Sequence, residues 1–210
     1  MTNYIEINNA RLCNCHRGYL SCIEPRNWMK NQIGVWQFTY EPRDVRDKKV
    51  HPAVFPISMA KRVIEQFTHK GELVLDPFVG SGTTLVAAQD LERNAVGFDL
   101  KQEYVDLSNA RVANPPENHP CKQIAVCDDA RNIVNRITPG TVKLVFTSPP
   151  YANILNRERK NKSRRGDLRK NEQFGKIEQY SQDPRDLGTL SVENFEKVIS
   201  EIFLEMKPVF

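Results

Sequence analysis

The length and composition of this chain exclude several classes of protein. Its 210 residues are 40% apolar and 27% charged, as in a globular domain with its own core and unlike a disordered chain. No apolar run approaches the roughly 18 residues of a membrane-spanning helix, and the N-terminus lacks a signal-peptide layout, so we expect a cytoplasmic protein with no membrane partner. The net charge of +4 excludes little by itself.

The first part of the chain has no sustained periodicity. We therefore expect residues 1–50 to form an irregular extension, with a strand over 34–40. Residues 58–71 then carry apolar side chains at helical spacing, which predicts a helix that stops at Gly71.

Apolar strands and helices alternate through the rest of the chain. Strands are predicted at 72–78, 94–100, 122–129 and 142–148. Helices are predicted at 83–92, 102–113, 130–137 and 191–207. The second of these helices should have Tyr104, Leu107 and Val112 on a common apolar side, and the last should begin at Ser191 as its N-cap. This order is typical of an α/β fold with a doubly wound, mainly parallel sheet, in which ligands bind beyond the carboxyl ends of the strands.

A glycine-rich turn, LDPFVGSGTT, ends the first of these strands. Gly80 and Gly82 allow a tight turn and close approach of a ligand to a helix N-terminus. The turn is not a phosphate-binding P-loop, because the required lysine is missing, and Leu85 stands where a dinucleotide fingerprint has its third glycine. Asp76 adds negative charge where a pyrophosphate would lie, which favours a ligand with a positive or amino group.

The next two strands also end in carboxylates. Asp99 is suited to accept hydrogen bonds from both hydroxyls of a ribose. Asp128 or Asp129 is suited to meet an adenine amino group, and Asp129 is equally suited to cap the helix that follows. The implied ligand has an adenosine and a cationic or amino end without phosphate, and S-adenosylmethionine fits this description.

The fourth strand ends in the stiff corner TSPPY, residues 147–151. Pro149 and Pro150 donate no backbone hydrogen bonds and cannot extend a central strand. A plain proline turn is one explanation, and the motifs at the neighbouring strand ends disfavour it.

With these motifs the sequence resembles the DNA amino-methyltransferases that modify cytosine N4 or adenine N6. DPFVGSGTT resembles their cofactor loop, and TSPPY resembles their catalytic Ser/Asp/Asn-Pro-Pro-Tyr tetrapeptide. HPAVFP resembles the segment that helps hold the methionine end of the cofactor, and GFDLKQEYVDLSNAR resembles the ribose-binding strand and its helix. The resemblance covers residues 49–207. It implies a Rossmann-like methyltransferase fold, incomplete in this chain, with residues 51–210 as the N-terminal part of the catalytic domain.

The resemblance also implies roles for individual residues. S-adenosyl-L-methionine would be bound by His51, Pro52, Asp76, Pro77, Phe78, Gly80, Ser81, Gly82, Thr83, Thr84, Asp99 and Asp128. The Ser148 oxygen and the Pro149 carbonyl would accept both amine protons of the target base, in a corner that Pro150 helps to stiffen. Tyr151 would stack on the base after it has flipped out of the duplex. No metal is needed for this chemistry, and we expect none.

We therefore expect a site-specific DNA methyltransferase, for which restriction-modification is one setting. Cytosine N4 is favoured over adenine N6, because Ser148 takes the first place of the tetrapeptide. One alternative is an RNA guanine-N2 methyltransferase, whose family has a similar loop and corner but usually Asp or Asn before the prolines. The other alternative is a catalytically silent, nucleic-acid-binding fragment of a split methyltransferase.

The family fold normally carries more strands than the four predicted here. A truncated product, one half of a split enzyme, or a subunit completed by another chain would each explain the difference. We expect a second subunit or a homodimer partner to complete the sheet, because the fourth strand would otherwise leave an apolar edge. The isolated chain should then be weakly active or inactive.

Positive charge is concentrated in one basic loop, predicted at 157–176. Eight basic residues make up most of this charge, namely Arg157, Arg159, Lys160, Lys162, Arg164, Arg165, Arg169 and Lys170. A solvated loop is one interpretation, and a loop that tracks DNA phosphates is the other.

The chain has five cysteines, an odd number without a secretion signal, so no disulfide framework is expected. Cys13, Cys15, His16 and Cys22 are close enough in sequence to suggest a metal. Their spacing is not that of a standard zinc motif, and we expect reduced structural thiols.

Overall fold

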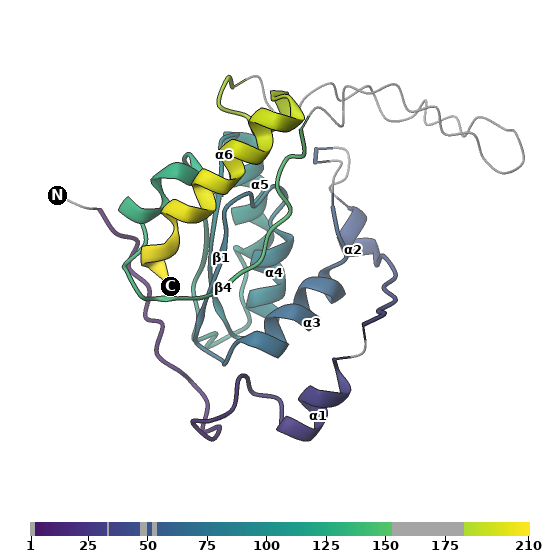
Figure 1. Cartoon of the computed structure of the whole chain (residues 1–210). Coiled ribbons are helices and arrows are strands. Elements are labelled where there is room, and N and C mark those ends of the chain that lie inside the picture. The colour runs from purple at the N-terminus through teal and green to yellow at the C-terminus, as the bar shows by residue number, and fades with distance from the viewer. Residues whose placement is uncertain (1–2, 33, 47–49, 52–53, 153–182) are drawn as a thin grey trace, which may run out of the picture.

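The computed structural model describes residues 3–32, 34–46, 50–51, 54–152 and 183–210. These residues form a single four-stranded sheet with helices on both of its faces (Figure 1). The strands are β1 (Leu73–Asp76), β2 (Asn94–Asp99), β3 (Gln123–Cys127) and β4 (Val142–Val145). Within the described ranges, no helix is long and apolar enough to cross a membrane.

All strand pairs are parallel, and the strands lie in the order β3-β2-β1-β4. The chain runs from β1 to β2 and then β3 in one direction, and β4 returns to the opposite side of β1. This reversal makes the sheet doubly wound and Rossmann-like, which confirms the predicted fold class. It also places the carboxyl ends of β1 and β4 next to each other, where such sheets bind their ligands.

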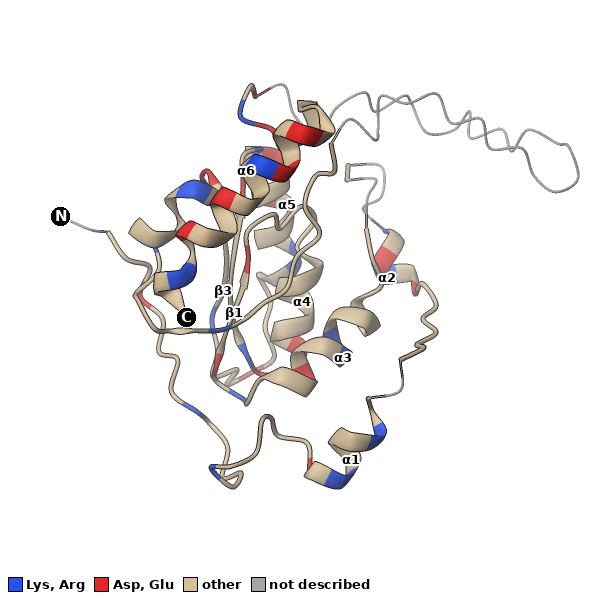
Figure 2. Ribbon diagram, viewed as in Figure 1, with Lys and Arg blue, Asp and Glu red and all other residues tan. Residues whose placement is uncertain are grey.

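Two layers of helices cover the sheet (Figure 1). One face carries α3 (Ile57–Phe67), α4 (Thr83–Asp90) and α5 (Gln102–Val112). The other face carries α6 (Val192–Glu205) and the short 3-10 helices η1 (Ala130–Asn135), η2 (Leu187–Thr189) and η3 (Lys207–Val209). Alternate strand residues supply the two cores: Val74 and Ala95 belong to the first, and Leu75 and Val96 to the second. The charged residues of α6, coloured on the ribbon in Figure 2, are all exposed.

The predicted helices and strands after residue 57 are present, with corrected ends. Helix α3 ends at Phe67, because Thr68 has an extended backbone; Gly71 is left-handed, with φ +85°, in the turn before β1. Strand β4 ends at Val145, earlier than predicted, and the helix expected at 130–137 is a 3-10 helix. The N-cap at Ser191 is confirmed, since its hydroxyl accepts a hydrogen bond from the Asn194 N–H.

One further prediction was wrong: residues 34–40 form no strand. Helix α5 buries Tyr104, Val105, Ser108 and Val112, and Leu107 is half-buried. The buried Ser108 lies where α5 packs closely against the glycine loop.

In the described part of the N-terminal extension there are two short helices, α1 (Pro25–Lys30) and α2 (Pro42–Val45). Its first part packs Ile5 and Ile7 against the core beneath α6. The extension then runs along the sheet to its amino end, where α1 lies (Figure 1). There the Leu12 N–H donates to the Lys70 carbonyl (2.8 Å), in the turn between α3 and β1.

Candidate functional site

The loop between β1 and α4 is shaped by two left-handed glycines. Gly80 has φ +49° and Gly82 has φ +79°, a region that side chains disfavour. A Cβ at Gly82 would lie 2.8 Å from the Ser108 hydroxyl oxygen of α5, so the position also has no room for a side chain. The Ser108 hydroxyl donates to the Gly80 carbonyl (2.8 Å), and an Arg111 guanidinium nitrogen donates to the Ser81 carbonyl (2.7 Å). Helix α5 therefore clamps the loop in one shape.

His51 covers the same loop from the other side. A Cβ at Gly80 would lie 2.6 Å from His51 Nε2, so the imidazole packs directly on the glycine. The ring also meets the Tyr104 ring edge-to-face, with centroids 4.7 Å apart. Burial, together with the charges of Lys101 and Arg111, lowers the pKa of His51 to about 4. His51 is therefore neutral at physiological pH.

Asp99, at the end of β2, faces the loop with a partly exposed carboxylate. Its Oδ2 accepts the Gly80 N–H (3.0 Å), and its Oδ1 accepts the Lys101 N–H (3.0 Å). A carboxylate oxygen accepts two hydrogen bonds, so each oxygen keeps a position for a ligand hydroxyl. Burial raises the pKa of Asp99 to about 6, and the nearby carboxylates of Asp76 and Asp186 add to this effect.

Asp76, at the end of β1, lies beneath the loop and is only 1% exposed. Its Oδ1 accepts the Phe78 N–H (3.1 Å) and the Thr147 hydroxyl (2.6 Å). Its Oδ2 accepts the Thr84 hydroxyl (2.5 Å) at the start of α4. Burial raises the pKa of Asp76 to about 6, although these three hydrogen bonds favour the ionised form. One buried carboxylate thus joins β1, the glycine loop, α4 and the residue before the SPPY corner.

The SPPY corner follows directly from this connection. The Phe146 N–H donates to the Leu75 carbonyl (3.0 Å), which continues the pairing of β4 with β1 beyond the end of the strand. After Thr147 the chain leaves the sheet: Ser148 is exposed, and the Tyr151 ring is 47% exposed. The two prolines between them are half-buried. The tetrapeptide therefore lies at the carboxyl end of the sheet, held there through Thr147 and Asp76.

The two aspartates after β3 have different roles. Asp129 is the N-cap of η1, and its side chain accepts the Arg131 N–H (3.0 Å). Asp128 accepts hydrogen bonds from the Asp129 N–H (2.8 Å) and the Asn132 amide (2.7 Å), and it remains partly exposed at the carboxyl end of β3. Of the two, Asp128 is the one available to a ligand.

The other predicted cofactor residues divide by exposure. Phe78 is half-buried, whereas the remaining members of the loop are buried, namely Pro77, Gly80, Ser81, Gly82, Thr83 and Thr84. These buried residues shape the loop. Pro52 lies outside the described residues, as do all the basic-loop residues, Arg157, Arg159, Lys160, Lys162, Arg164, Arg165, Arg169 and Lys170.

Four residues of the site had no predicted role. Thr147, Ser108 and Arg111 form the connections described above, and Asp186 lies close enough to Asp99 to raise its pKa. The threonine was visible inside TSPPY, and the serine stands out as a small polar residue in an apolar helix face. Nothing local marks Arg111, because its partner Ser81 is 30 positions away. Locally, Asp186 is only the N-cap of η2, and its proximity to Asp99 depends on the fold.

Comparison with known proteins gives consistent matches to DNA methyltransferases. Residues 8–110 match the family model for DNA methylases. Type II methyltransferase M.BglI of Bacillus subtilis is 42% identical over 96 residues, which cover 46% of this chain and 26% of that relative. M.SmaI of Serratia marcescens is 40% identical over 89 residues, covering 42% and 29% of the two chains. M.HpaI of Haemophilus parainfluenzae is 34% identical over 82 residues, covering 39% and 26%.

Each match covers only part of this chain and only part of the relative. The chain spans less than a third of the length of each of these three relatives. Among solved structures, TTHA0409 of Thermus thermophilus, in complex with S-adenosyl-L-methionine, is 35% identical over 34% of this chain and 29% of that one, with a TM-score of 0.29. The family match begins at residue 8, inside the irregular extension, and includes the glycine loop and Asp99. Over residues 8–110, this chain is therefore similar to the DNA methylase family.

Proposed function

We propose that this protein is an S-adenosylmethionine-dependent DNA methyltransferase that modifies an exocyclic base amine, with cytosine N4 favoured. One observation carries the proposal: the hydrogen bond from the Thr147 hydroxyl to Asp76 (2.6 Å). It attaches the SPPY corner to the strand that leads into the glycine loop. A methyl donor on the loop and a base at the corner would therefore lie next to each other at the switch between β1 and β4.

The loop and its carboxylates suit S-adenosylmethionine. Both oxygens of Asp99 can accept one further hydrogen bond, which matches the two hydroxyls of a ribose. The carboxylates of Asp76, Asp99 and Asp186 interact electrostatically, and this concentration of negative charge disfavours a phosphate. It favours the amino group and the sulfonium of the methionine end. When bound, the cofactor supplies the electrophilic methyl group.

Asp76 itself acts on the cofactor indirectly. Its carboxylate is buried and already accepts three hydrogen bonds from the protein. We therefore assign it the role of a positioning residue, which holds the loop and the corner in register and contributes charge at close range. The partly exposed Asp99, Asp128 and Phe78 remain for direct contact with the ligand.

The SPPY corner offers hydrogen-bond acceptors that would make an exocyclic amine more nucleophilic. The nitrogen lone pair is delocalised into the base ring, so the amine is a weak nucleophile. Hydrogen-bond acceptors at Ser148 and at the Pro149 carbonyl would draw the nitrogen toward tetrahedral geometry and localise its lone pair. The amine could then take the methyl group as the S–CH₃ bond breaks to leave a neutral thioether, and it would lose one proton to solvent. The prolines fix these acceptors before the base arrives, so little reorganisation is needed. The exposed Tyr151 ring is accessible for stacking against a base flipped out of the duplex.

The finer assignments rest on the sequence. Ser148 as the first residue of the tetrapeptide favours cytosine over adenine. Contact between the basic loop and DNA phosphates remains a prediction, as does a partner subunit that adds strands beside β4. A DNA substrate also agrees with the predicted cytoplasmic location.

The test separates cofactor binding from methyl transfer. Wild-type protein should bind S-adenosylmethionine in a calorimeter, and Asp99→Ala should weaken binding about tenfold or more, since two charge-assisted hydrogen bonds are lost. Ser148→Ala should bind the cofactor normally but reduce tritiated methyl transfer to DNA by about 10²-fold. Mass spectrometry of the digested DNA should then identify N4-methylcytosine.

Ser200→Ala is the matched control, because that hydroxyl lies exposed on α6 and bonds only to its own helix. It should change neither measurement. Failure of the wild-type protein to bind the cofactor would refute the proposal. Undiminished transfer by Ser148→Ala would refute the role of the corner, and faster transfer to transfer RNA than to DNA would refute the substrate.

A further inference from the structure

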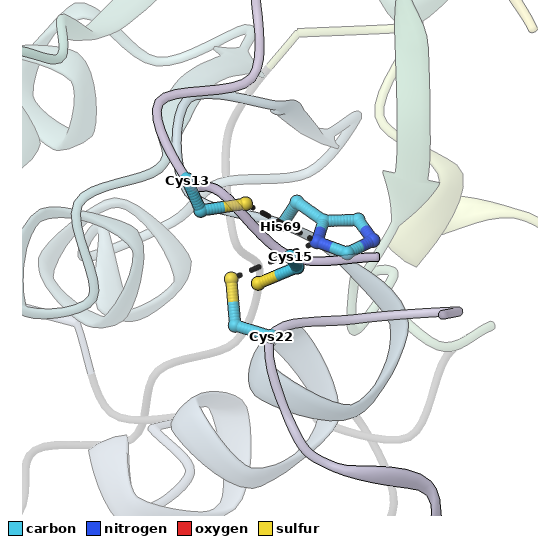
Figure 3. Close-up of side chains that lie close together, drawn as sticks. All are labelled: Cys13, Cys15, Cys22 and His69. Carbon is cyan, nitrogen blue, oxygen red and sulfur yellow. Dashed lines mark hydrogen bonds between the residues drawn. The ribbon is translucent and has the colours of Figure 1, made fainter. Parts of the chain in front are cut away.

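Three cysteines and a histidine meet at the amino end of the sheet, opposite the SPPY corner. Cys13, Cys15 and Cys22 come from the extension, and His69 comes from the turn between α3 and β1. The four possible ligand atoms all lie within 4.8 Å of one another. Figure 3 shows the sulfur atoms of Cys13 and Cys22 in contact with the imidazole of His69, and the Cys15 sulfur beside that of Cys22. His16, the histidine that the local sequence suggested, is not part of this group.

We propose that these four side chains form a structural zinc site. Zinc in such sites is tetrahedral, with Zn–S near 2.3 Å and Zn–N near 2.0–2.1 Å, which puts S and N ligand atoms about 3.6 Å apart. In the structure His69 Nδ1 lies 3.4 Å from the Cys13 sulfur and 3.7 Å from the Cys22 sulfur. These two distances match the S–N spacing of such a site, and the Cys15 sulfur lies within 4.8 Å of the other three atoms.

The second nitrogen of His69 fixes the ring for metal binding. Nε2 lies 3.0 Å from the Tyr19 carbonyl oxygen, which only accepts hydrogen bonds. Nε2 must therefore carry the proton of the neutral ring, and Nδ1 presents its lone pair to the three sulfur atoms. A ligating histidine that donates its other N–H to a carbonyl is the usual outer-shell arrangement of zinc sites. The side chain is fully buried, so no water competes for this orientation.

The surroundings also favour thiolates. The Lys70 N–H donates to the Cys22 sulfur (3.4 Å), a hydrogen bond that favours the thiolate. Three sulfur atoms this close would repel one another as anions, and a divalent cation removes that repulsion. When zinc binds, each thiol releases its proton, so a dication and three thiolates leave a net charge of −1.

A metal also explains how this part of the extension is held. From residue 11 to residue 30 only Ser21 is buried, and helix α1 buries no side chain at all. The segment therefore has almost no apolar core of its own. Besides the ligands, its attachments to the domain include the Leu12 N–H to Lys70 and the Trp28 indole to the Gln66 carbonyl (2.9 Å). Four protein ligands complete the tetrahedron, so the site is structural.

The first experiment measures metal content. The full chain, purified under reducing conditions without chelator, should contain about one zinc per molecule by inductively coupled plasma mass spectrometry. Cys22→Ser and His69→Gln should lower this value at least severalfold. The matched controls are Cys121→Ser and His16→Gln, because both residues lie outside the cluster; these variants should retain the metal.

A second measurement uses the wild-type protein, so that it remains informative if the variants fail to fold. Wild-type protein stripped of metal and reloaded with Co²⁺ should show thiolate-to-cobalt charge transfer and the intense visible bands of tetrahedral cobalt. Removing zinc should also lower the unfolding temperature by about 5 °C or more, and ZnCl₂ should restore it.

Either of two outcomes would overturn the proposal. One is less than about 0.1 zinc per chain after incubation with ZnCl₂ under reducing conditions, with no tetrahedral cobalt spectrum. The other is a loss of metal from His16→Gln as large as that from His69→Gln. None of these measurements depends on methyl transfer, so the result is independent of the proposed function.

Discussion

The two ends of the sheet are built on different principles. At the carboxyl end, buried carboxylates organise main-chain N–H groups and hydroxyls: Asp76 accepts three hydrogen bonds and Asp99 accepts two. At the amino end, an extension with scarcely a buried side chain is attached by a few hydrogen bonds and a group of four ligand atoms. The first end has a rigid interior and a partly exposed rim, as a site for chemistry requires. The second needs only an anchor.

The largest effect is expected at Gly71, where the extension packs on the turn before β1. Gly71 has φ +85° and no space for a side chain. An added Cβ would overlap the Ala10 carbonyl oxygen and lie 2.8 Å from Leu12 Cγ. Gly71→Ala should therefore cost about 3 kcal/mol or more in unfolding free energy, as left-handed strain and overpacking add. Gly140→Ala is the control, because φ is +70° there and the nearest atom to a Cβ would be 3.9 Å away.

Denaturant unfolding measures both variants. The control should lose only about 1–2 kcal/mol, the cost of the left-handed backbone alone. Gly71→Ala should also reduce zinc content, since it displaces the segment that carries the cysteines. Equal stability losses in the two variants would mean that the extension is not packed on this turn.

The next effect tests the carboxyl end through the two hydroxyls that Asp76 accepts. Thr84→Val leaves Oδ2 of the buried carboxylate without a donor, and Thr147→Val leaves Oδ1 with the Phe78 N–H alone. Each loss should cost about 1–3 kcal/mol of stability. Only Thr147 leads into the SPPY corner. Thr147→Val should therefore reduce methyl transfer about tenfold or more beyond the effect of Thr84→Val, because small displacements of positioned groups are costly.

Calorimetric binding and single-turnover transfer separate these two threonine variants. Both should bind S-adenosylmethionine with similar affinity. Equal transfer rates in the two variants would show that the corner is positioned without the help of Asp76.

A smaller effect concerns pH. Burial raises the pKa of Asp99 to about 6, above the value of about 3.9 in an unfolded chain. The folded protein holds this proton more tightly, so Asp99 should reduce stability as pH rises from about 4 to about 6 and have a constant effect above that. Cofactor affinity should change in the opposite direction and increase as pH rises through 6, because the ionised carboxylate accepts the ribose hydroxyls.

The comparison with Asp99→Asn isolates this titration. His51 changes the stability in the opposite direction. Its pKa is lowered to about 4 in the folded protein, so protonation of the unfolded chain reduces stability as pH falls below about 6.5. The stability difference between wild type and Asp99→Asn should therefore vary between pH 4 and 6 in thermal melts. A difference that stays constant over that range would contradict the assignment.

The smallest effect should come from a surface ion pair at the amino end. Lys70 and Glu92 are 2.6 Å apart, with 43% and 44% of their side chains exposed. Solvent screens such pairs, so Glu92→Gln should change the unfolding free energy by less than about 0.5 kcal/mol. Zinc content should not change. A large loss of metal in this variant would mean that surface charge, and not the four ligands, holds the extension.

Local sequence signals were enough to predict much of the carboxyl end. Gly80 and Gly82 have the left-handed backbone that the turn required, and the strands that end at Asp76 and Asp99 lie where their alternation with helices indicated. The double proline ends its strand for a covalent reason, the missing N–H. Such features depend on a few residues that are neighbours in the sequence, so the sequence alone is enough to predict them.

The tertiary structure alone decided which distant residues meet. The Thr147 hydroxyl contacts Asp76, which lies 71 positions away in the sequence. His69 contacts Cys22, which lies 47 positions away, whereas His16, next to Cys15 in the sequence, is outside the cluster. The choice between Asp128 and Asp129 also depended on the start of η1. The physical reason is that periodicity and turn chemistry determine elements one at a time. Contacts between elements arise only when sheet order and helix packing bring separate segments together.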